Sequence, residues 1–399
     1  MILVLSCVFP PEPVVSASLS IAIARTLSQE HDVTVLSPMP TRPNGSIYSK
    51  PDFRGEHFTH VITDSYVCPA SKFIGRMRES LSFGRCIAGY IREHHENISV
   101  IYANVWPVFS QYLAVKEAKR WGIPVVLHIQ DIYPESMLGR LGIVGRMITW
   151  PLLKLDRIIL QNASTVLAIS ENMKSYLCNT RHIEDSKVLV VRNWQDDSLF
   201  TKSSEHTDQE KFTFMFVGSI SPAAGVMLLL KAFVRAAIPD SQLVIAGAGS
   251  DKAACEAYAR QHPEADIRFR SVTPTEVAQV QSGADVLLLP LRKGVGHTAS
   301  PSKMPAYMFS AKPVLACVDR GSDVEMVIHA SQCGWVCEPE NESALSEMMI
   351  RVTGIPREQL NEMGRNARKY ALEHFTAARN LNVITNCIKS LINANKKNY

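Results

Sequence analysis

The sequence predicts an α/β protein with two doubly wound parallel sheets, one in each half of the chain. Short apolar runs alternate with longer segments of helical periodicity, which is the pattern of strands joined by helical crossovers. The alternation stops at a polar stretch, residues 201–211, and then starts again. A length of 399 residues also suits about two domains at roughly 100 to 200 residues each.

The first half opens on a buried strand at residues 2–6, followed by a helix at 16–30. Further strands are expected at 32–37, 100–103, 124–129, 165–170 and 187–193. We assign residues 1–200 to an N-terminal domain.

The second half repeats the pattern from residue 211 onward. Strands are expected at 212–219, 242–249, 267–271, 284–291 and 312–318, and helices such as 227–237 and 252–262 separate them. Residues 211–399 therefore form a C-terminal domain, with the last helix expected to pack back on the first domain. Because open α/β sheets bind ligands at the carboxyl ends of their strands, we expect both domains to face a shared cleft.

Composition excludes several functional classes. The formal charge of +4 comes from 42 basic and 38 acidic residues, a balance that does not favour nucleic acid as a partner. The nine cysteines are scattered, which fits reduced thiols in the cytoplasm, and the close pair Cys333 and Cys337 lacks further metal ligands nearby. Arg146, Lys154 and Arg157 interrupt the best candidate for a spanning helix, so we expect none.

Residues 10–18, PPEPVVSAS, form the first candidate ligand loop. Ser16 and Ser18 open the first helix, where free backbone N–H groups favour an anion such as a phosphate. The alternative is that either serine only caps the helix.

The strand at 124–129 leads to the second candidate. His128 and Asp131 stand at its carboxyl end, where a reactive group belongs, and Glu135 continues the loop. The alternatives are a structural histidine and carboxylates that cap helices.

The third candidate is the loop at 292–305, RKGVGHTASPSKMP. Ser302 and Lys303 supply a hydroxyl, N–H donors and a cation at a helix start, which suits the diphosphate leaving group of a nucleotide sugar. Arg292 is a weaker donor-binding candidate, since it could be solvated.

Other nucleotide motifs are weak or missing. Residues 247–249, GAG, resemble part of a dinucleotide fingerprint, but Lys252 stands at the third glycine position and no acidic ribose partner follows. Neither a Walker A loop nor a G-x-S-x-G elbow occurs. Kinase, ATPase, hydrolase and nicotinamide oxidoreductase functions are therefore disfavoured.

Seven segments, read in order, resemble glycosyltransferase family 4 over nearly the whole chain: PPEPVVSAS, HIQDIYPES, AISENM, RNW, VGS, PSKMPAYMFSAKPV and GWVCEPEN. Within the family they look most like bacterial O-antigen and capsule enzymes that transfer N-acetyl-L-fucosamine or a related amino sugar. The resemblance implies two Rossmann-like domains of the GT-B type, a UDP-sugar held by the C-terminal domain, and transfer without a metal ion or other cofactor.

The resemblance also implies roles for individual residues. His128 would lie against the donor sugar, Asp131 would orient the acceptor hydroxyl, and Ser302 with Lys303 would hold the diphosphate. Gly218 and Ser219 of the VGS segment would belong to the donor site. Glu325 could supply a polar contact there, although a carboxylate at a helix start is an equal alternative.

Some family features are missing. Thr298 and Ala306 stand where the larger branch carries two glutamates, and Val14–Ser16 replace a Gly-Gly pair. Ser219, Ser221 and Gly225 follow the VGS strand, where an arginine and a lysine are usual. These departures weaken the transfer of ribose and phosphate contacts from the family.

The implied acceptor is a lipid-linked saccharide, which requires contact with a membrane. Residues 72–92 and 138–160 mix aliphatic and basic side chains, as in helices that lie in the headgroup region. The alternative is that both are ordinary amphipathic helices packed on the sheet. We expect a cytoplasmic protein bound peripherally to the inner face of the bacterial cytoplasmic membrane.

The predicted activity is transfer of a sugar from a UDP-sugar to a polyprenyl-diphosphate-linked sugar. Two rivals remain: a nucleotide-sugar 2-epimerase of the same fold, and a nonenzymatic scaffold that binds nucleotide sugars.

Overall fold

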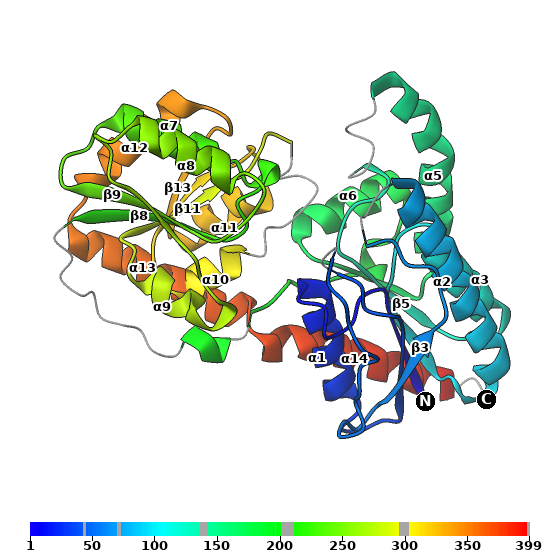
Figure 1. The fold of residues 1–399 in the computed structure, drawn as a ribbon. Coiled ribbons are helices and arrows are strands. Elements are labelled where there is room, and N and C mark those ends of the chain that lie inside the picture. Colours follow the sequence, from blue (N-terminus) through cyan, green and yellow to red (C-terminus); the bar gives the residue numbers. More distant parts are fainter. Residues whose placement is uncertain are drawn as a thin grey trace. The chain divides into compact units, whose positions relative to one another are not determined.

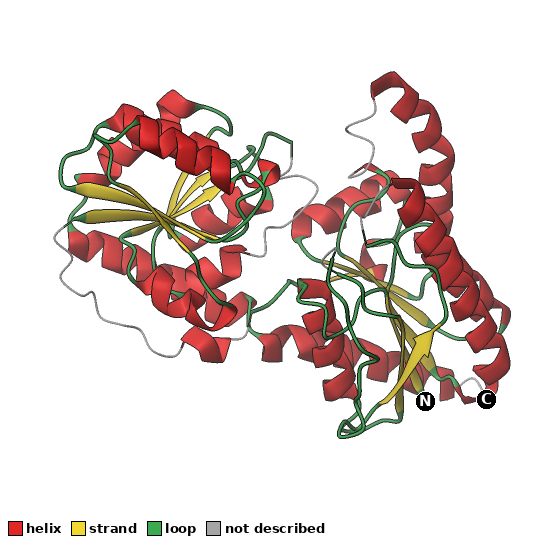
Figure 2. Cartoon of the chain, in the orientation of Figure 1, coloured by secondary structure: helices red, strands yellow, loops and turns green. Residues whose placement is uncertain are grey.

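The structure is a computed structural model that describes residues 1–42, 45–69, 73–135, 142–195, 197–200, 211–294 and 303–396. The chain forms two compact units: unit 1 is Met1–Arg192 with Asn380–Tyr399, and unit 2 is Asn193–Arg379. Each unit holds one parallel sheet with helices on both of its faces (Figure 1). Figure 2 shows the same alternation of strands and helices by secondary structure.

Unit 1 contains a seven-stranded sheet in the order β3-β2-β1-β4-β5-β6-β7, with parallel pairing throughout. Its strands are β1 (Ile2–Ser6), β2 (Val33–Pro38), β3 (Thr59–Thr63), β4 (Val100–Asn104), β5 (Val125–Ile129), β6 (Thr165–Ala168) and β7 (Val188–Val190). Its helices are α1 (Val15–Leu27), α2 (Phe73–His94), α3 (Phe109–Arg120), α5 (Gly142–Asn162), α6 (Glu171–Arg181) and most of α14 (Ala377–Lys396).

The core of unit 1 explains why its central strands are continuous apolar runs. β1, β4 and β5 are buried along their whole length because helices cover both faces of the sheet. Alternate residues such as Leu5, Ile101 and Leu127 join one cluster with Phe83 of α2. Full burial of a side chain like Phe83 contributes about 1.5 to 3 kcal/mol.

Unit 2 contains a six-stranded parallel sheet in the order β10-β9-β8-β11-β12-β13. Its strands are β8 (Phe212–Val217), β9 (Ser241–Ala246), β10 (Ile267–Arg270), β11 (Val286–Pro290), β12 (Val314–Cys317) and β13 (Gly334–Cys337). Its helices are α7 (Val226–Ala236), α8 (Lys252–Gln261), α9 (Val277–Ser282), α10 (Lys303–Phe309), α11 (Asp323–Ser331), α12 (Glu342–Thr353) and α13 (Arg357–His374).

Strand β8 shows how both faces of this sheet are filled. Phe214 and Phe216 pack in a cluster with α7 and α12, while Met215 and Val217 pack in a second cluster with α10 and α13. The period of two along the strand therefore sends its side chains to two separate cores.

The boundary between the units differs from the predicted one. The short helix η3 (Asp197–Phe200) belongs to unit 2, because Phe200 stacks on Phe309 at 5.7 Å between ring centroids and its carbonyl accepts a hydrogen bond from Arg368 at 3.0 Å. Unit 2 thus begins at Asn193, and the chain returns to unit 1 at Asn380. The polar stretch expected as a linker lies outside the described residues except for Lys211.

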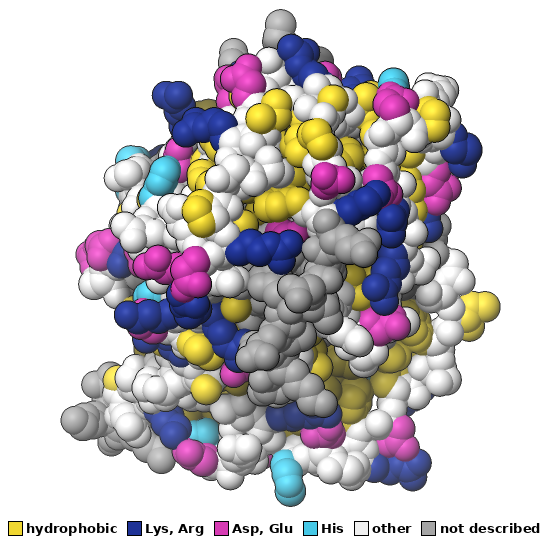
Figure 3. Space-filling model, turned by 90° about the vertical axis from the view of Figure 1, so that its left-hand side faces the viewer, with side chains coloured by type: hydrophobic (Ala, Val, Ile, Leu, Met, Phe, Trp, Pro, Cys, Tyr) yellow, Lys and Arg dark blue, Asp and Glu magenta, His cyan; other side chains and the backbone are white. Residues whose placement is uncertain are grey.

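The described helices include none that is long and apolar enough to cross a membrane. On the face drawn in Figure 3, Lys and Arg side chains are interspersed with Asp and Glu. Among the described residues on that face, the mixture of charges agrees with the balanced composition.

Candidate active site

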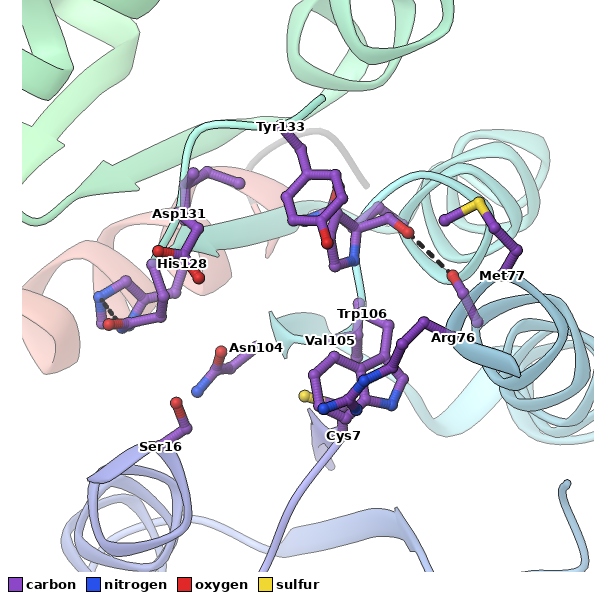
Figure 4. A pocket seen from close by; sticks show the side chains of 15 residues that line it. Cys7, Ser16, Arg76, Met77, Asn104, Val105, Trp106, His128, Asp131 and Tyr133 are labelled. Carbon is purple, nitrogen blue, oxygen red and sulfur yellow. Dashed lines mark hydrogen bonds between the residues drawn. The ribbon is translucent and has the colours of Figure 1, made fainter. Parts of the chain in front are cut away.

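A pocket of about 240 Å³ lies at the carboxyl ends of β1, β4 and β5 in unit 1 (Figure 4). The strand order runs outward in opposite directions from β1 and β4, so the pocket stands where the topology of the sheet reverses. Such points are where open α/β sheets bind ligands. The volume is below the roughly 300 to 1,000 Å³ of drug-sized sites, so one sugar ring suits it better than a whole nucleotide sugar.

His128 lines this pocket from the end of β5. Its neighbours Leu127 and Ile129 join the main core of unit 1, so alternation along the strand turns His128 to the other face. The imidazole is 2% exposed, with Nδ1 at 2.6 Å from the Tyr102 hydroxyl and Nε2 at 3.0 Å from the side-chain amide of Gln130. Burial lowers the pKa of His128 to about 4, so the ring is neutral near pH 7.

Asp131 lines the same pocket as His128. It keeps contact with solvent, yet the surrounding walls desolvate its carboxyl enough to raise the pKa. Within the described part of the chain, no donor forms a hydrogen bond with this carboxylate. A partly desolvated carboxylate without a protein donor can accept a hydrogen bond from a ligand hydroxyl, and this role of Asp131 stays a prediction.

Glu135 follows in the same loop but has a structural position. Arg181 of α6, which is 2% exposed, donates to Glu135 at 2.8 Å, to Asp156 of α5 at 2.7 Å and to the carbonyl of Tyr133 at 2.7 Å. Burial raises the pKa of Glu135, but the hydrogen bonds from Arg181 and Tyr176 outweigh it and hold the pKa below its usual value. This ion cluster fixes the loop whose Tyr133 lines the pocket.

Arg76 and Trp106 form the opposite wall of the pocket. The Arg76 guanidinium lies 4.1 Å from the ring centroid of Trp106 and contacts the buried Glu79 at 3.1 Å. Arg42 contacts Glu79 at 2.7 Å and lies over the same ring at 4.6 Å. Arg76 belongs to the segment 72–92 that was expected to face a membrane, and its place in the pocket wall corrects that expectation for this side chain.

Ser16 also lines the pocket, from the first turn of α1, whereas Ser18 is exposed and is not part of the lining. The helix cap is Val14, with no hydrogen bond from a side chain, so the alternative that either serine caps the helix is wrong. Asn104, the last residue of β4, completes this side of the pocket and donates to Ser20 at 3.4 Å.

In unit 2, the loops that follow β8 and β9 run against each other. Gly218 N–H donates to the Ala246 carbonyl at 2.9 Å, and Ile220 N–H donates to the Ala248 carbonyl at 2.9 Å. A Cβ on Gly247 or Gly249 would meet a carbonyl oxygen of the β8 loop at 2.0 or 2.1 Å. Close packing of the two loops therefore explains why residues 247 and 249 are glycines, and no dinucleotide-binding role is needed to account for them.

Lys303 is the first residue of α10, and its side chain packs against Gly218 in the loop that follows β8 (the Gly218 loop). A Cβ on Gly218, where φ is +147°, would meet Lys303 Cε at 2.1 Å, so the missing side chain makes room for the lysine. The ammonium lies 5.0 Å from the Phe216 ring centroid, and burial lowers its pKa. One helical turn later, the Tyr307 hydroxyl donates to the Val217 carbonyl at 3.1 Å and accepts from the Val217 N–H at 3.0 Å, which anchors α10 to β8.

The order of strands places Lys303 at the reversal point of the second sheet. β8 and β11 are neighbours, and the sheet continues from β8 to β9 on one side and from β11 to β12 on the other. Among the described residues, no carboxylate lies within ion-pair distance of the Lys303 ammonium. A half-buried cation at this point fits an anionic ligand.

The other donor-site candidates have varied positions. Ser219 and Arg292 are exposed, and Ser302 lies outside the described residues. Glu325 accepts a hydrogen bond from the Gly321 N–H, while its own N–H donates to Ser322 at 3.3 Å, so it serves as a capping carboxylate of α11. Donor contacts by these residues stay predictions.

Several pocket residues escaped the sequence analysis. Four residues contact the ligand space of the unit 1 pocket or its lining: Tyr102, Asn104, Trp106 and Gln130. Asn104, Trp106 and Gln130 lie at or just beyond the ends of β4 and β5, and this position was the available signal, whereas Tyr102 lies in the middle of β4. In unit 2, Asp319 accepts hydrogen bonds from the Gly294 N–H at 2.8 and 3.0 Å. Within the described residues, no group of three or more His, Cys, Asp or Glu side chains could hold a metal ion.

Comparison with known families identifies the class of protein. Residues 18–199 match the model for Glycosyltransferase Family 4, and residues 197–370 match the model for Glycosyl transferases group 1. The protein is a GT-B glycosyltransferase.

This glycosyltransferase is 22% identical over 288 residues to the probable glycosyltransferase WbjE of Pseudomonas aeruginosa. The matched segment covers 69% of this chain and 70% of that relative. The crystal structure of Anabaena Alr3699/HepE in complex with UDP has a TM-score of 0.68 at 15% identity and covers 98% of this chain and 99% of its own. WaaG, a glycosyltransferase involved in lipopolysaccharide biosynthesis, has a TM-score of 0.63 at 14% identity over 93% and 95% of the two chains. At these identities the solved structures show the shared fold.

The neutral state of His128 in the glycosyltransferase predicts a pH dependence of stability. The unfolded chain holds a histidine with a pKa of about 6.5. Since the folded pKa is about 4, the unfolded state binds more protons between these values, and the free energy of unfolding falls as the pH falls. We expect His128 to account for a loss of about 2 kcal/mol between pH 7.5 and pH 5.

Urea denaturation of wild type and His128→Gln at the two pH values measures this share. The variant is expected to lose less stability on acidification than wild type, while His57→Gln, at an exposed position, should behave like wild type. An identical pH dependence in wild type and His128→Gln would show that the imidazole is not held neutral by the fold.

Proposed function

We propose that this enzyme transfers a sugar, N-acetyl-L-fucosamine or a related amino sugar, from a UDP-sugar to a polyprenyl-diphosphate-linked saccharide. The product would serve bacterial O-antigen or capsule synthesis. The observation that carries the proposal is the half-buried Lys303 ammonium on the Gly218 loop, with no carboxylate partner in the described part of the chain. The UDP bound to the similar Anabaena HepE supports the choice of nucleotide.

The chemistry of the leaving group explains why a lysine is needed. As the bond from the sugar to the diphosphate breaks, negative charge develops on the diphosphate oxygens. A cation already in place stabilises that charge more than it stabilises the ground state, and partial burial strengthens the interaction. We propose that Lys303 supplies this cation without a metal ion, so that a chelator such as EDTA leaves the rate unchanged.

The unit 1 pocket is proposed to hold a sugar. Its amide and carboxylate groups suit hydroxyl and amide partners, and Asp131 would accept a hydrogen bond from the attacking hydroxyl of the acceptor. Its raised pKa brings the Asp131 carboxyl nearer to working pH, which favours proton transfer. The similarity to WaaG, a glycosyltransferase involved in lipopolysaccharide biosynthesis, supports a role in surface polysaccharide synthesis.

A product assay tests the proposed function against its rivals. The purified protein is incubated with UDP-N-acetyl-L-fucosamine, alone and with a polyprenyl-diphosphate-linked saccharide, and products are identified by mass spectrometry. We expect a lipid-linked product one sugar longer, formed only with the acceptor. A new nucleotide sugar from donor alone would indicate an epimerase, and binding without any product would indicate a scaffold.

A membrane-facing stripe is proposed on α5. Trp150, Lys154 and Ile158 follow at intervals of four residues, and Trp150 and Ile158 are 67% and 46% exposed. The Lys154 ammonium lies 4.9 Å from the Trp150 ring centroid. An apolar stripe with a cation suits the headgroup region, where each cation near anionic lipid contributes about 1 kcal/mol.

Helix α2 retains less of the membrane prediction. Phe83 is buried in the core of unit 1 and Arg76 lines the pocket, so the alternative of an amphipathic helix packed on the sheet holds for those residues. Ile74 is 80% exposed, and Arg78 and Arg85 are exposed as well. Membrane contact by the described part of 72–92 rests on these three side chains.

Vesicle sedimentation tests the α5 stripe. With vesicles rich in anionic lipid, Trp150→Ala is expected to lower the bound fraction severalfold, because the indole leaves the interface. Ile350→Ala, at a position 50% exposed on α12, is the matched control and should bind like wild type. Equal binding of wild type and Trp150→Ala, or indifference to anionic lipid, would remove the stripe from the proposal.

A further inference from the structure

The interior of unit 1 contains a hydrogen-bonded chain that leads to the pocket. Tyr102 lies in the middle of β4, is 0% exposed and does not line the pocket. Its hydroxyl is 2.6 Å from His128 Nδ1, and His128 Nε2 is 3.0 Å from the side-chain amide of Gln130. Gln130 is half-buried and lines the pocket.

The protons in this chain can be placed by counting donors and acceptors. A neutral imidazole carries one N–H donor and one acceptor nitrogen. Within the described part of the chain, His128 Nδ1 is the sole hydrogen-bond partner of the Tyr102 hydroxyl. If Nδ1 carried the proton, the buried hydroxyl would have no acceptor, at a cost of about 1 to 3 kcal/mol. The hydroxyl therefore donates to Nδ1, and the ring proton is on Nε2.

The proton on Nε2 then sets the orientation of Gln130. The His128 Nε2–H group needs an acceptor, which must be the side-chain oxygen of Gln130. Turning the terminal amide of Gln130 by half a turn places this oxygen next to His128 Nε2. The NH₂ group of Gln130 is left to face the ligand space of the pocket. An amide held in this orientation presents two N–H donors to an oxygen atom.

We propose that Tyr102 and His128 are positioning residues that orient Gln130, and that Gln130 binds an oxygen of the sugar, with the carbonyl of an N-acetyl group as the expected partner. The identity of the ligand as a sugar rests on the proposed function. The first test below does not, because the proton positions can be measured in the ligand-free protein. The carbonyl could belong to the donor sugar or to the acceptor saccharide.

The first test is a nitrogen-15 NMR spectrum of the ligand-free protein with labelled histidine, in which the signals of His128 are assigned by their loss in His128→Gln. We expect the imine-type shift at Nδ1 and the pyrrole-type shift at Nε2. Tyr102→Phe removes the hydroxyl alone, and its spectrum should show a mixture of both tautomers. A pyrrole-type shift at Nδ1 in wild type overturns the proposal, whatever the enzymatic activity.

The second test separates the two sources of the carbonyl. KM is measured for donors with and without the N-acetyl group, and then for acceptors with and without it. Gln130→Glu replaces the donors by acceptors, and we expect KM for one N-acetylated substrate to rise about tenfold, with little change for its analogue that lacks the group. Tyr102→Phe should shift the same KM in the same direction by a smaller factor. Equal effects on acetylated and non-acetylated substrates would overturn the assignment of Gln130.

Discussion

Replacing Lys303 with alanine is expected to lower kcat at least tenfold, which corresponds to about 1.4 kcal/mol of barrier, with the fold intact. The loss follows from the placement of the ammonium on the Gly218 loop, where it would meet the diphosphate as its negative charge develops. Initial rates at saturating donor and acceptor measure the change, and thermal unfolding checks the fold.

Two further variants separate charge from packing. Lys303→Met keeps an unbranched side chain over Phe216 but removes the cation, and it should be as slow as the alanine variant. Lys231→Ala removes an exposed lysine on α7 and should turn over like wild type. If Lys303→Met retained the wild-type rate, the lysine would act through packing and the charge assignment would be wrong.

Replacing Arg181 with methionine is expected to destabilise unit 1 by about 3 to 5 kcal/mol, because Asp156 and Glu135 lose their common cation in a largely buried cluster. The pKa of Asp156 is raised by burial to about 6 even with Arg181 present, so the carboxylate depends on this partner. The same arginine holds the Tyr133 carbonyl at 2.7 Å, and we expect the activity to fall as the pocket loop loosens.

Chemical denaturation of matched variants tests the role of the cluster. Arg25→Ala breaks an exposed hydrogen-bonded pair with Glu56 in the same unit, and it should cost about 0 to 1 kcal/mol. The double variant Arg181→Met with Asp156→Asn should recover part of the loss, since one buried carboxylate is removed. A cost for Arg181→Met no larger than that for Arg25→Ala would contradict the account of the cluster.

The strands of both sheets were predictable where the chain is buried on two faces. Runs such as FTFMFV and PVVLHI are continuous because helices cover both sides of the sheet. Strand β3 was missed because its residues, THVIT, are half-buried or exposed at the edge of the sheet and make no apolar run. The short β13, GWVC, is likewise half-buried over three of its four residues.

The site was predictable where a strand end or the start of a helix determines it, as for Ser16 at the start of α1. His128 lies at the end of β5 and Asp131 directly follows the strand, and the structure places both in the pocket. The two arginines that pack on Trp106 are Arg76 of α2 and Arg42 of a loop, 30 and 64 residues earlier in the chain, and no local pattern reveals such contacts. The roles of Glu135 and Glu325 depend on partners that spacing alone cannot rank against ligands.

Calorimetric titration of the protein with UDP and with uridine is the most direct test of the central claim, that Lys303 holds a nucleoside diphosphate. We predict that wild type binds UDP much more tightly than uridine, and that Lys303→Met loses at least tenfold in affinity for UDP while its affinity for uridine stays the same. Equal UDP affinity in wild type and Lys303→Met would contradict the claim.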